Sequence, residues 1–235
     1  MLTEFVPDRL WTAQVPLRFY GIEMGTRMTV CRLHSGELWV HSPIAPTKEL
    51  QQELDALGKV SFIVAPNKLH HLFVLDFLTA YPDAKLFGSP DLPQKRPDIP
   101  FHGILGDRSE PGWASEIDQV LVRGNICLDE VVFFHQNSRT LILTDLCESA
   151  HADSPLSFRI MGRLTGIYDR PGPPHRYETR VSRQADCERF PGKSYVLGLR
   201  SHNSCSRAFN PFTRKRVVRP SLQICFVRSK SGGKR

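Results

Sequence analysis

Polar and apolar positions alternate through the first part of the chain, and the pattern predicts short strands joined by turns. Such runs stand at residues 10–15, 27–33 and 38–41, and a turn at 34–37 separates the last two. Two alternating runs joined by a short polar turn are typical of a β-hairpin. We therefore expect 27–33 and 38–41 to pair as antiparallel strands.

Helical spacing first appears near residue 50. Leu50, Leu54 and Leu57 recur at intervals of four and three residues, which places them on one face of a helix. Thr47 precedes them as an N-cap residue, and Gly58 follows where a helix can end without strain. The pattern predicts one helix between these two residues.

An apolar strand is predicted over residues 60–65, and it ends at a proline that cannot donate to a sheet. Asn67 is a good N-cap, and apolar residues recur behind it at helical spacing to about residue 81. His70 and His71 would then lie in the first turn of a helix, at the edge where α/β folds bind ligands. The positive end of the helix dipole favours neutral imidazole, the form that can bind a metal. Alternatively, one of the two histidines is a surface residue and the other packs against the sheet.

The second half of the chain is richer in strands than in helices. Strands are predicted at 84–88 and 118–124, and a hairpin at 130–135 and 140–146. Residues 89–116 are rich in Pro, Gly and Asp and are expected to be irregular. Strands that alternate with helices and then dominate indicate a layered α/β protein.

Two polar residues at predicted strand ends could carry chemistry. Asp145 ends an apolar strand, where a carboxylate can ligate an ion, orient a histidine or simply cap a turn. His135 ends the preceding strand and faces either the same edge or solvent, while His41 is a weaker candidate. The sequence has no phosphate-binding glycine loop, nucleophile elbow or dinucleotide fingerprint.

Three stretches agree in order and spacing with a known group of proteins: residues 26–30 with 38–44, residues 64–71 and residues 131–146. They resemble an uncharacterised domain-of-unknown-function family within the metallo-β-lactamase-like superfamily, over about residues 1–185. The resemblance implies an α/β fold, the four-layer αββα sandwich of the metallo-β-lactamase-like proteins, with a metal site at one sheet edge. The family's last elements have no match after about residue 184, so we expect the sandwich to be incomplete at its C-terminus.

The resemblance also implies which residues would face a metal. The superfamily's His-x-His-x-Asp-His loop falls on Pro66 to His71, and its later aspartate falls on Asp145. Pro66 and Lys68 stand at the first two histidine positions, and His70 stands at the aspartate position. A two-metal site is therefore not expected, and the Lys68 cation would repel an ion unless it points away.

One ion, Zn²⁺ or Fe²⁺, remains compatible with the resemblance. Its implied ligands are His70, His71 and Asp145, with His135 as a further or supporting ligand. Adjacent side chains in a helical turn diverge by about 100°, which favours His71 as the ligand and turns His70 elsewhere. The implied activity is metal-dependent hydrolysis of a small molecule. The alternative is a degenerate, non-catalytic scaffold that binds a small ligand or a protein partner at the same edge.

Charge divides the chain into two parts. The formal net charge is +7, yet residues 189–235 hold twelve Lys and Arg and no Asp or Glu, which leaves 19 basic and 24 acidic residues before them. We therefore expect a metallo-β-lactamase-like domain over 1–185 and a basic, irregular or disordered tail over 186–235. Such a tail could arise from a frameshift, an unspliced intron or an alternative exon. Nucleic-acid binding is not expected, and the basic tail is the only segment that could provide it.

Cysteine usage and hydropathy indicate the compartment. The six cysteines are scattered without a Cys-x-x-Cys pair, which is typical of reduced thiols. No apolar run approaches the ~20 residues of a membrane span. The first residues show no signal region, so we expect a cytoplasmic protein with no membrane contact.

Overall fold

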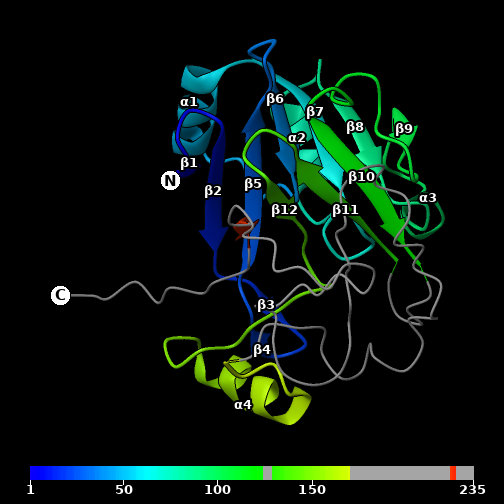
Figure 1. Ribbon diagram of the computed structural model, residues 1–235. Helices are drawn as coiled ribbons and strands as arrows, with labels where there is room; N and C mark the ends of the chain where they lie inside the picture. The colour runs from blue at the N-terminus through cyan, green and yellow to red at the C-terminus, as the bar shows by residue number, and fades with distance from the viewer. Residues whose placement is uncertain (124–128, 170–222, 226–235) are drawn as a thin grey trace, which may run out of the picture.

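Two β-sheets packed face to face form the body of the protein in the computed structural model (Figure 1). The structure describes residues 1–123 and 129–169, and the backbone of 223–225. The predicted boundary between the domain, 1–185, and the basic tail, 186–235, therefore lies outside the described residues. Among the described helices, none is long and apolar enough to cross a membrane.

The larger sheet has seven strands. Its order is β1-β2-β5-β6-β7-β8-β9, antiparallel as far as β6 and parallel from there on. The strands are β1 (Thr3–Val6), β2 (Leu10–Val15), β5 (Thr26–Arg32), β6 (Leu38–His41), β7 (Val60–Ala65), β8 (Lys85–Gly88) and β9 (Gly103–Ile104). The carboxyl ends of the four parallel strands consequently point to one edge.

The smaller sheet contains the second predicted hairpin. Its strands are β10 (Ile117–Val122), β11 (Glu130–His135), β12 (Thr140–Ile142) and β13 (Gln223–Cys225), and β12 and β13 run parallel. Phe133 pairs with Ile142 and His135 with Thr140 across the hairpin. The turn side of this hairpin is therefore the His135 side, and its open side is the Glu130 side.

Aromatic side chains fill the space between the sheets. Trp39, Trp113 and Phe133 are fully buried there, and the Trp39 and Phe133 rings lie 4.9 Å apart in an edge-on arrangement. Helices α1 (Lys48–Leu57) and α2 (Val74–Ala80) cover the outer face of the larger sheet, as Figure 1 shows. A smaller group consists of α4 (Leu156–Thr165) and the hairpin of β3 (Arg18–Phe19) and β4 (Ile22–Glu23).

Most of the predicted elements are confirmed. The strands at 10–15, 38–41 and 60–65 have the predicted bounds, and α1 begins after Thr47, whose hydroxyl accepts a hydrogen bond from the Leu50 N–H. The region 89–116 contains only the short helix α3 (Leu92–Lys95) and β9. Helix α4 was not among the predicted elements.

The helix predicted from Asn67 is wrong in its first part. Residues 67–73 form turns, and α2 begins only at Val74. The Asn67 side chain accepts hydrogen bonds from the Leu69 and His70 N–H groups, as an N-cap does, but this closes a turn and no helix follows directly. His70 and His71 therefore leave the chain from an irregular loop.

Candidate functional site at the sheet edge

Four segments of the chain meet at one edge of the sandwich. The residue after β6, the loop after β7, the first residue of β11 and the loop after β12 lie together, and the Val131 N–H donates to the Pro66 carbonyl at 2.9 Å. Most of the polar side chains that these segments bring together are buried, while the side chains of His70 and Asp145 keep 14% and 12% of their exposure. We call them the edge cluster, and its members are His41, Ser42, Asn67, His70, Glu130, Thr144, Asp145 and Glu148.

Asn67 joins the two halves of the edge cluster. Its amide nitrogen donates to Asp145 Oδ2 and Thr144 Oγ1, both at 2.8 Å, and also lies 3.2 Å from Glu130 Oε2. Its carbonyl oxygen caps the loop that carries His70. Because Asn67 is fully buried, these contacts are shielded from water and fix the two loops against each other.

Glu130 supports the loop that presents Asp145. One carboxylate oxygen accepts from the Thr144 N–H at 2.6 Å and the other from the Leu146 N–H at 3.1 Å. Complete burial, with the charge of Asp145, raises the pKa of Glu130 to about 7. Both oxygens of this carboxyl group therefore have backbone partners.

His70 lies between Ser42 and Asp145. Its Nδ1 shares a 2.6 Å hydrogen bond with Ser42 Oγ, and its Nε2 is 3.3 Å from Asp145 Oδ1. Burial by itself would lower the pKa of His70, but the charge and the hydrogen bond of Asp145 outweigh it and raise the pKa. The ring is thus oriented at both nitrogens.

Glu148 and His41 are two further buried titratable residues of the edge cluster. Glu148 is 8% exposed, and burial, followed by the charge of Asp145, raises its pKa to about 8. His41 is 1% exposed, and its Nε2 has no partner in the described part of the chain. Burial, then His70, lowers the pKa of His41 to about 3.

His71 and Lys68 lie on the other side of the same loop. The pKa of His71 is lowered to about 4, first by burial and then by Lys95 and Arg96 of the α3 region. Lys68 Nζ is 4.0 Å from Asp91 Oδ2, and its carbonyl accepts from Lys95 Nζ. The Lys68 cation is therefore turned towards α3 and does not compete with an ion in the edge cluster.

His135 lies at the far end of β11. Its Nδ1 is 2.6 Å from Ser138 Oγ in the hairpin turn, and burial, as the largest influence, lowers its pKa. His135 and Glu130 are the two ends of the six-residue strand β11, so they lie about 17 Å apart. Of the four residues expected to bind metal, the structure thus brings together His70 and Asp145, and places His71 and His135 elsewhere.

A test of these donors for a metal gives a limited fit. In the described ranges, no three His, Cys, Asp or Glu side chains are already arranged around one point. The edge cluster nevertheless offers an imidazole nitrogen, an Asp145 oxygen and a further buried carboxyl group, the donor types that divalent ions accept. His70 and Asp145 thus supply two donors at one point, and no third His, Cys, Asp or Glu of the described residues completes a metal site with them.

Sequence reasoning missed Glu130, Glu148 and Ser42, although one signal was available. If the register of Phe133 with Ile142 is continued by three residues, Glu130 stands across from Asp145. A predicted hairpin therefore already implied that these two carboxylates share an edge, and that His135 lies at the other end. Glu148 and Ser42 lie in loops, where residue periodicity gives no such signal.

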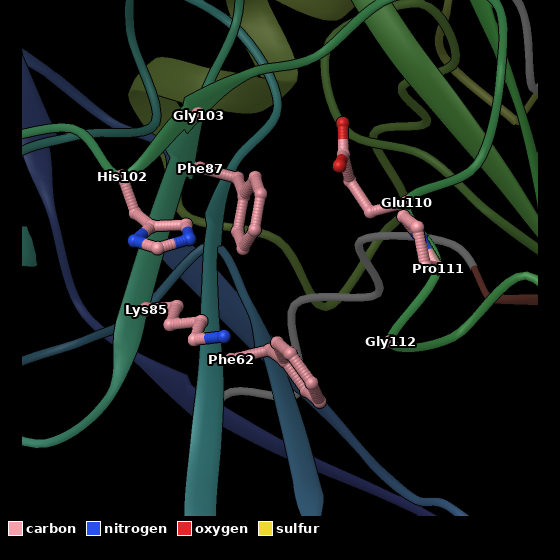
Figure 2. A pocket seen from close by; sticks show the side chains of 8 residues that line it. All are labelled: Phe62, Lys85, Phe87, His102, Gly103, Glu110, Pro111 and Gly112. Carbon is pink, nitrogen blue, oxygen red and sulfur yellow. The ribbon is translucent and has the colours of Figure 1, made fainter.

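A separate pocket of about 350 Å³ lies beside the outer strands of the larger sheet (Figure 2). Its walls include the Phe62 and Phe87 rings, with Lys85 and His102 on the strand side and residues 110–112 opposite. These residues are distinct from the edge cluster.

Comparison with known proteins shows the fold. A family described as "Domain of unknown function (DUF4336)" matches residues 7–169. No curated protein matches the chain. Among solved structures, the DIM-1 metallo-β-lactamase exposed to ceftazidime is 13% identical with a TM-score of 0.54, covering 63% of this chain and 71% of that one.

Two further structures agree. A metallo-β-lactamase from Pontibacter korlensis is 13% identical with a TM-score of 0.53, covering 75% of this chain and 94% of that one. The metallo-β-lactamase IND-7 is 13% identical with a TM-score of 0.52, covering 63% and 72%. At such low identity these likenesses establish the metallo-β-lactamase-like αββα sandwich and nothing about the reaction.

Proposed function

The chain belongs to the DUF4336 family of domains of unknown function, and from this membership and its fold we propose that it is a metal-dependent hydrolase of a small-molecule substrate. One ion, Zn²⁺ or Fe²⁺, would be held by His70 and Asp145 in the edge cluster. The substrate would contain an ester, thioester, lactone or phosphodiester bond.

One observation carries this proposal: His70 Nε2 and Asp145 Oδ1 meet at 3.3 Å in a buried cluster that also contains two glutamates. Buried carboxyl groups in such numbers need a cation or protons to balance them. An imidazole and a carboxylate directed at one point are ordinary ligands of Zn²⁺ and Fe²⁺.

The surrounding residues would position these ligands. Ser42 shares a hydrogen bond with Nδ1 of His70, and Nε2 is thereby directed towards Asp145. In metal-bound histidines the nitrogen that does not bind the metal commonly has such a hydrogen-bond partner. Asn67 and Glu130 fix the loop of Asp145. A bound divalent ion supplies Lewis acidity, which activates water and polarises the bond under attack.

The test is an activity screen of the full-length protein on these four bond types, before and after treatment with a chelator. We expect an activity that the chelator abolishes and added metal restores. Asp145→Asn should remove it, while Asp153→Asn, which changes an exposed aspartate outside the edge cluster, should leave it unchanged. An activity that survives both the chelator and Asp145→Asn would contradict the proposal.

A metal-free scaffold is the second candidate, and one observation favours it. His70 and Asp145 already contact each other directly, so the pair is satisfied without an ion. In that case the edge cluster would stabilise the fold and present a surface to a ligand or partner. A melting temperature that neither a chelator nor added Zn²⁺ changes would support this candidate.

A further inference from the structure

We propose that the pocket beside the outer strands of the larger sheet binds a free aromatic amino acid (Figure 2). The ring of this ligand would pack on Phe62 and Phe87, its carboxylate would lie at Lys85 and its ammonium group at Glu110. The volume of about 350 Å³ is at the lower end of small-molecule sites, which suits a ligand of this size. The pocket is separate from the edge cluster, so the inference goes beyond the proposed function and does not depend on an ion.

The floor of the pocket is aromatic because strand alternation directs side chains of β7 and β8 into the space between the sheets. Phe62 stands across from Lys85 in the parallel pairing, and Phe87 follows two residues later on β8, so the three side chains share one face. Both rings contact the fully buried Trp113, at ring-centre distances of 5.3 and 4.9 Å. The two rings are thus held by the core and reach the surface at the pocket, where a planar apolar group can pack on them.

Two glycines of the pocket make this aromatic floor possible. A Cβ at Gly103 would lie 2.7 Å from the Phe87 ring, and a Cβ at Gly112 would lie 2.5 Å from the Phe62 ring. A side chain at either position would therefore displace a ring, because such close contacts cannot be accommodated in a packed core. Each ring consequently lies directly against main chain on one wall of the pocket.

The charged residues of the pocket define the ligand more closely. Lys85 lies on the strand side and Glu110 on the opposite wall, and neither forms an ion pair with another described residue (Figure 2). The His102 ring lies edge-on to Phe87 at 5.5 Å and adds a hydrogen-bonding group beside Lys85. A carboxylic acid alone would meet the like charge of Glu110, and an amine alone would meet that of Lys85. A ligand with one group of each sign matches both walls.

The position of the pocket gives binding a consequence for the fold. Lys85 belongs to the larger sheet, whereas residues 110–112 precede β10, the first strand of the smaller sheet. A ligand held between these walls would connect the two layers. It should raise the melting temperature, because a ligand that binds only the folded chain stabilises it.

The test is a ligand-detected NMR titration of the full-length protein with L-phenylalanine and with analogues that each lack one group. Phenylpropanoate lacks the ammonium group, phenylethylamine lacks the carboxylate, and L-alanine lacks the ring. We expect L-phenylalanine to bind and to raise the melting temperature, and each analogue to bind at least ~5-fold more weakly.

Two variants assign the charges to their walls. Lys85→Met should weaken the binding of L-phenylalanine at least ~5-fold without weakening that of phenylethylamine, which has no carboxylate. Glu110→Gln should weaken L-phenylalanine to a similar extent without weakening phenylpropanoate, which has no ammonium group. Lys48→Met, which changes an exposed lysine at the start of α1, is the matched control and should change no affinity.

Three outcomes would overturn the proposal. The first is the absence of L-phenylalanine binding up to about 10 mM. The second is equal binding of L-phenylalanine and of either singly charged analogue, because a zwitterion would then have no advantage. The third is unchanged binding of L-phenylalanine in both Lys85→Met and Glu110→Gln, which would place the ligand outside this pocket.

Discussion

At the scale of single residues, two neighbouring histidines show how strongly surroundings decide chemistry. His70 lies against Asp145, which raises its pKa, whereas burial and two basic residues lower the pKa of His71 to about 4. The sequence identified the pair and favoured His71 as a metal ligand with His70 turned elsewhere, whereas the structure directs the His70 ring at Asp145. The direction of each ring follows from the turn that Asn67 caps and from the Ser42 hydroxyl, neither of which periodicity reveals.

Ser42 combines a hydrogen bond with an unfavourable backbone conformation. Its φ is 53°, in the left-handed region, which costs a residue with a Cβ about 1–2 kcal/mol. Ser42→Ala should lower the free energy of unfolding by roughly 1 kcal/mol, because the hydrogen bond to His70 is lost. Ser42→Gly should lose less, because glycine adopts this φ freely. Urea denaturation of both variants checks the order, and a less stable Ser42→Gly would contradict it.

Asn67 should be the most sensitive polar residue of the edge cluster. Asn67→Ala would leave buried carboxyl and backbone groups without partners, at about 1–3 kcal/mol for each unsatisfied group. We expect a loss of at least ~2 kcal/mol in the free energy of unfolding. Asn137→Ala, which changes an exposed turn asparagine, should stay within ~0.5 kcal/mol and serves as the control. Equal effects would contradict the bridging role.

At the scale of elements, the local sequence predicted several strands and α1 well, because apolar patterns and capping residues are recognised from neighbouring positions in the sequence. The strand at 60–65 and the helix between Thr47 and Gly58 are examples. The start of α2 was misplaced since Asn67 can cap a turn as readily as a helix. The placement of Glu130 opposite Asp145 was available from the hairpin register, whereas Glu148 lies in a loop, for which no register is available.

Gly112 lines the pocket between the outer strands and residues 110–112 (Figure 2). A Cβ at Gly112 would lie 2.5 Å from the Phe62 ring, and one at Gly106 would meet nothing within 4 Å. Gly112→Ala should therefore lower the free energy of unfolding by about 1–3 kcal/mol, because the ring must move in a packed core. Gly106→Ala should not lower it. Thermal denaturation of the two variants under the same conditions checks this prediction. Equal stabilities of Gly112→Ala and Gly106→Ala would contradict it.

At the scale of the whole molecule, the edge cluster exists because two sheets end at the same place. Ser42 and His70 come from the larger sheet, and Glu130, Asp145 and Glu148 from the smaller one. The resemblance anticipated this sandwich, and the fold comparison confirms it. The packing of the two sheets depends on contacts between residues about 100 positions apart, such as Trp39 with Phe133, which no local pattern contains.

The proposed function assigns the ion at this edge to His70 and not to His71. The most direct measurement is the metal content of the purified full-length protein by mass spectrometry, for the wild type, His70→Ala and His71→Ala. We predict about one Zn or Fe per chain in the wild type and in His71→Ala, and its loss in His70→Ala. Metal retained in His70→Ala, or no metal in the wild type, would contradict it.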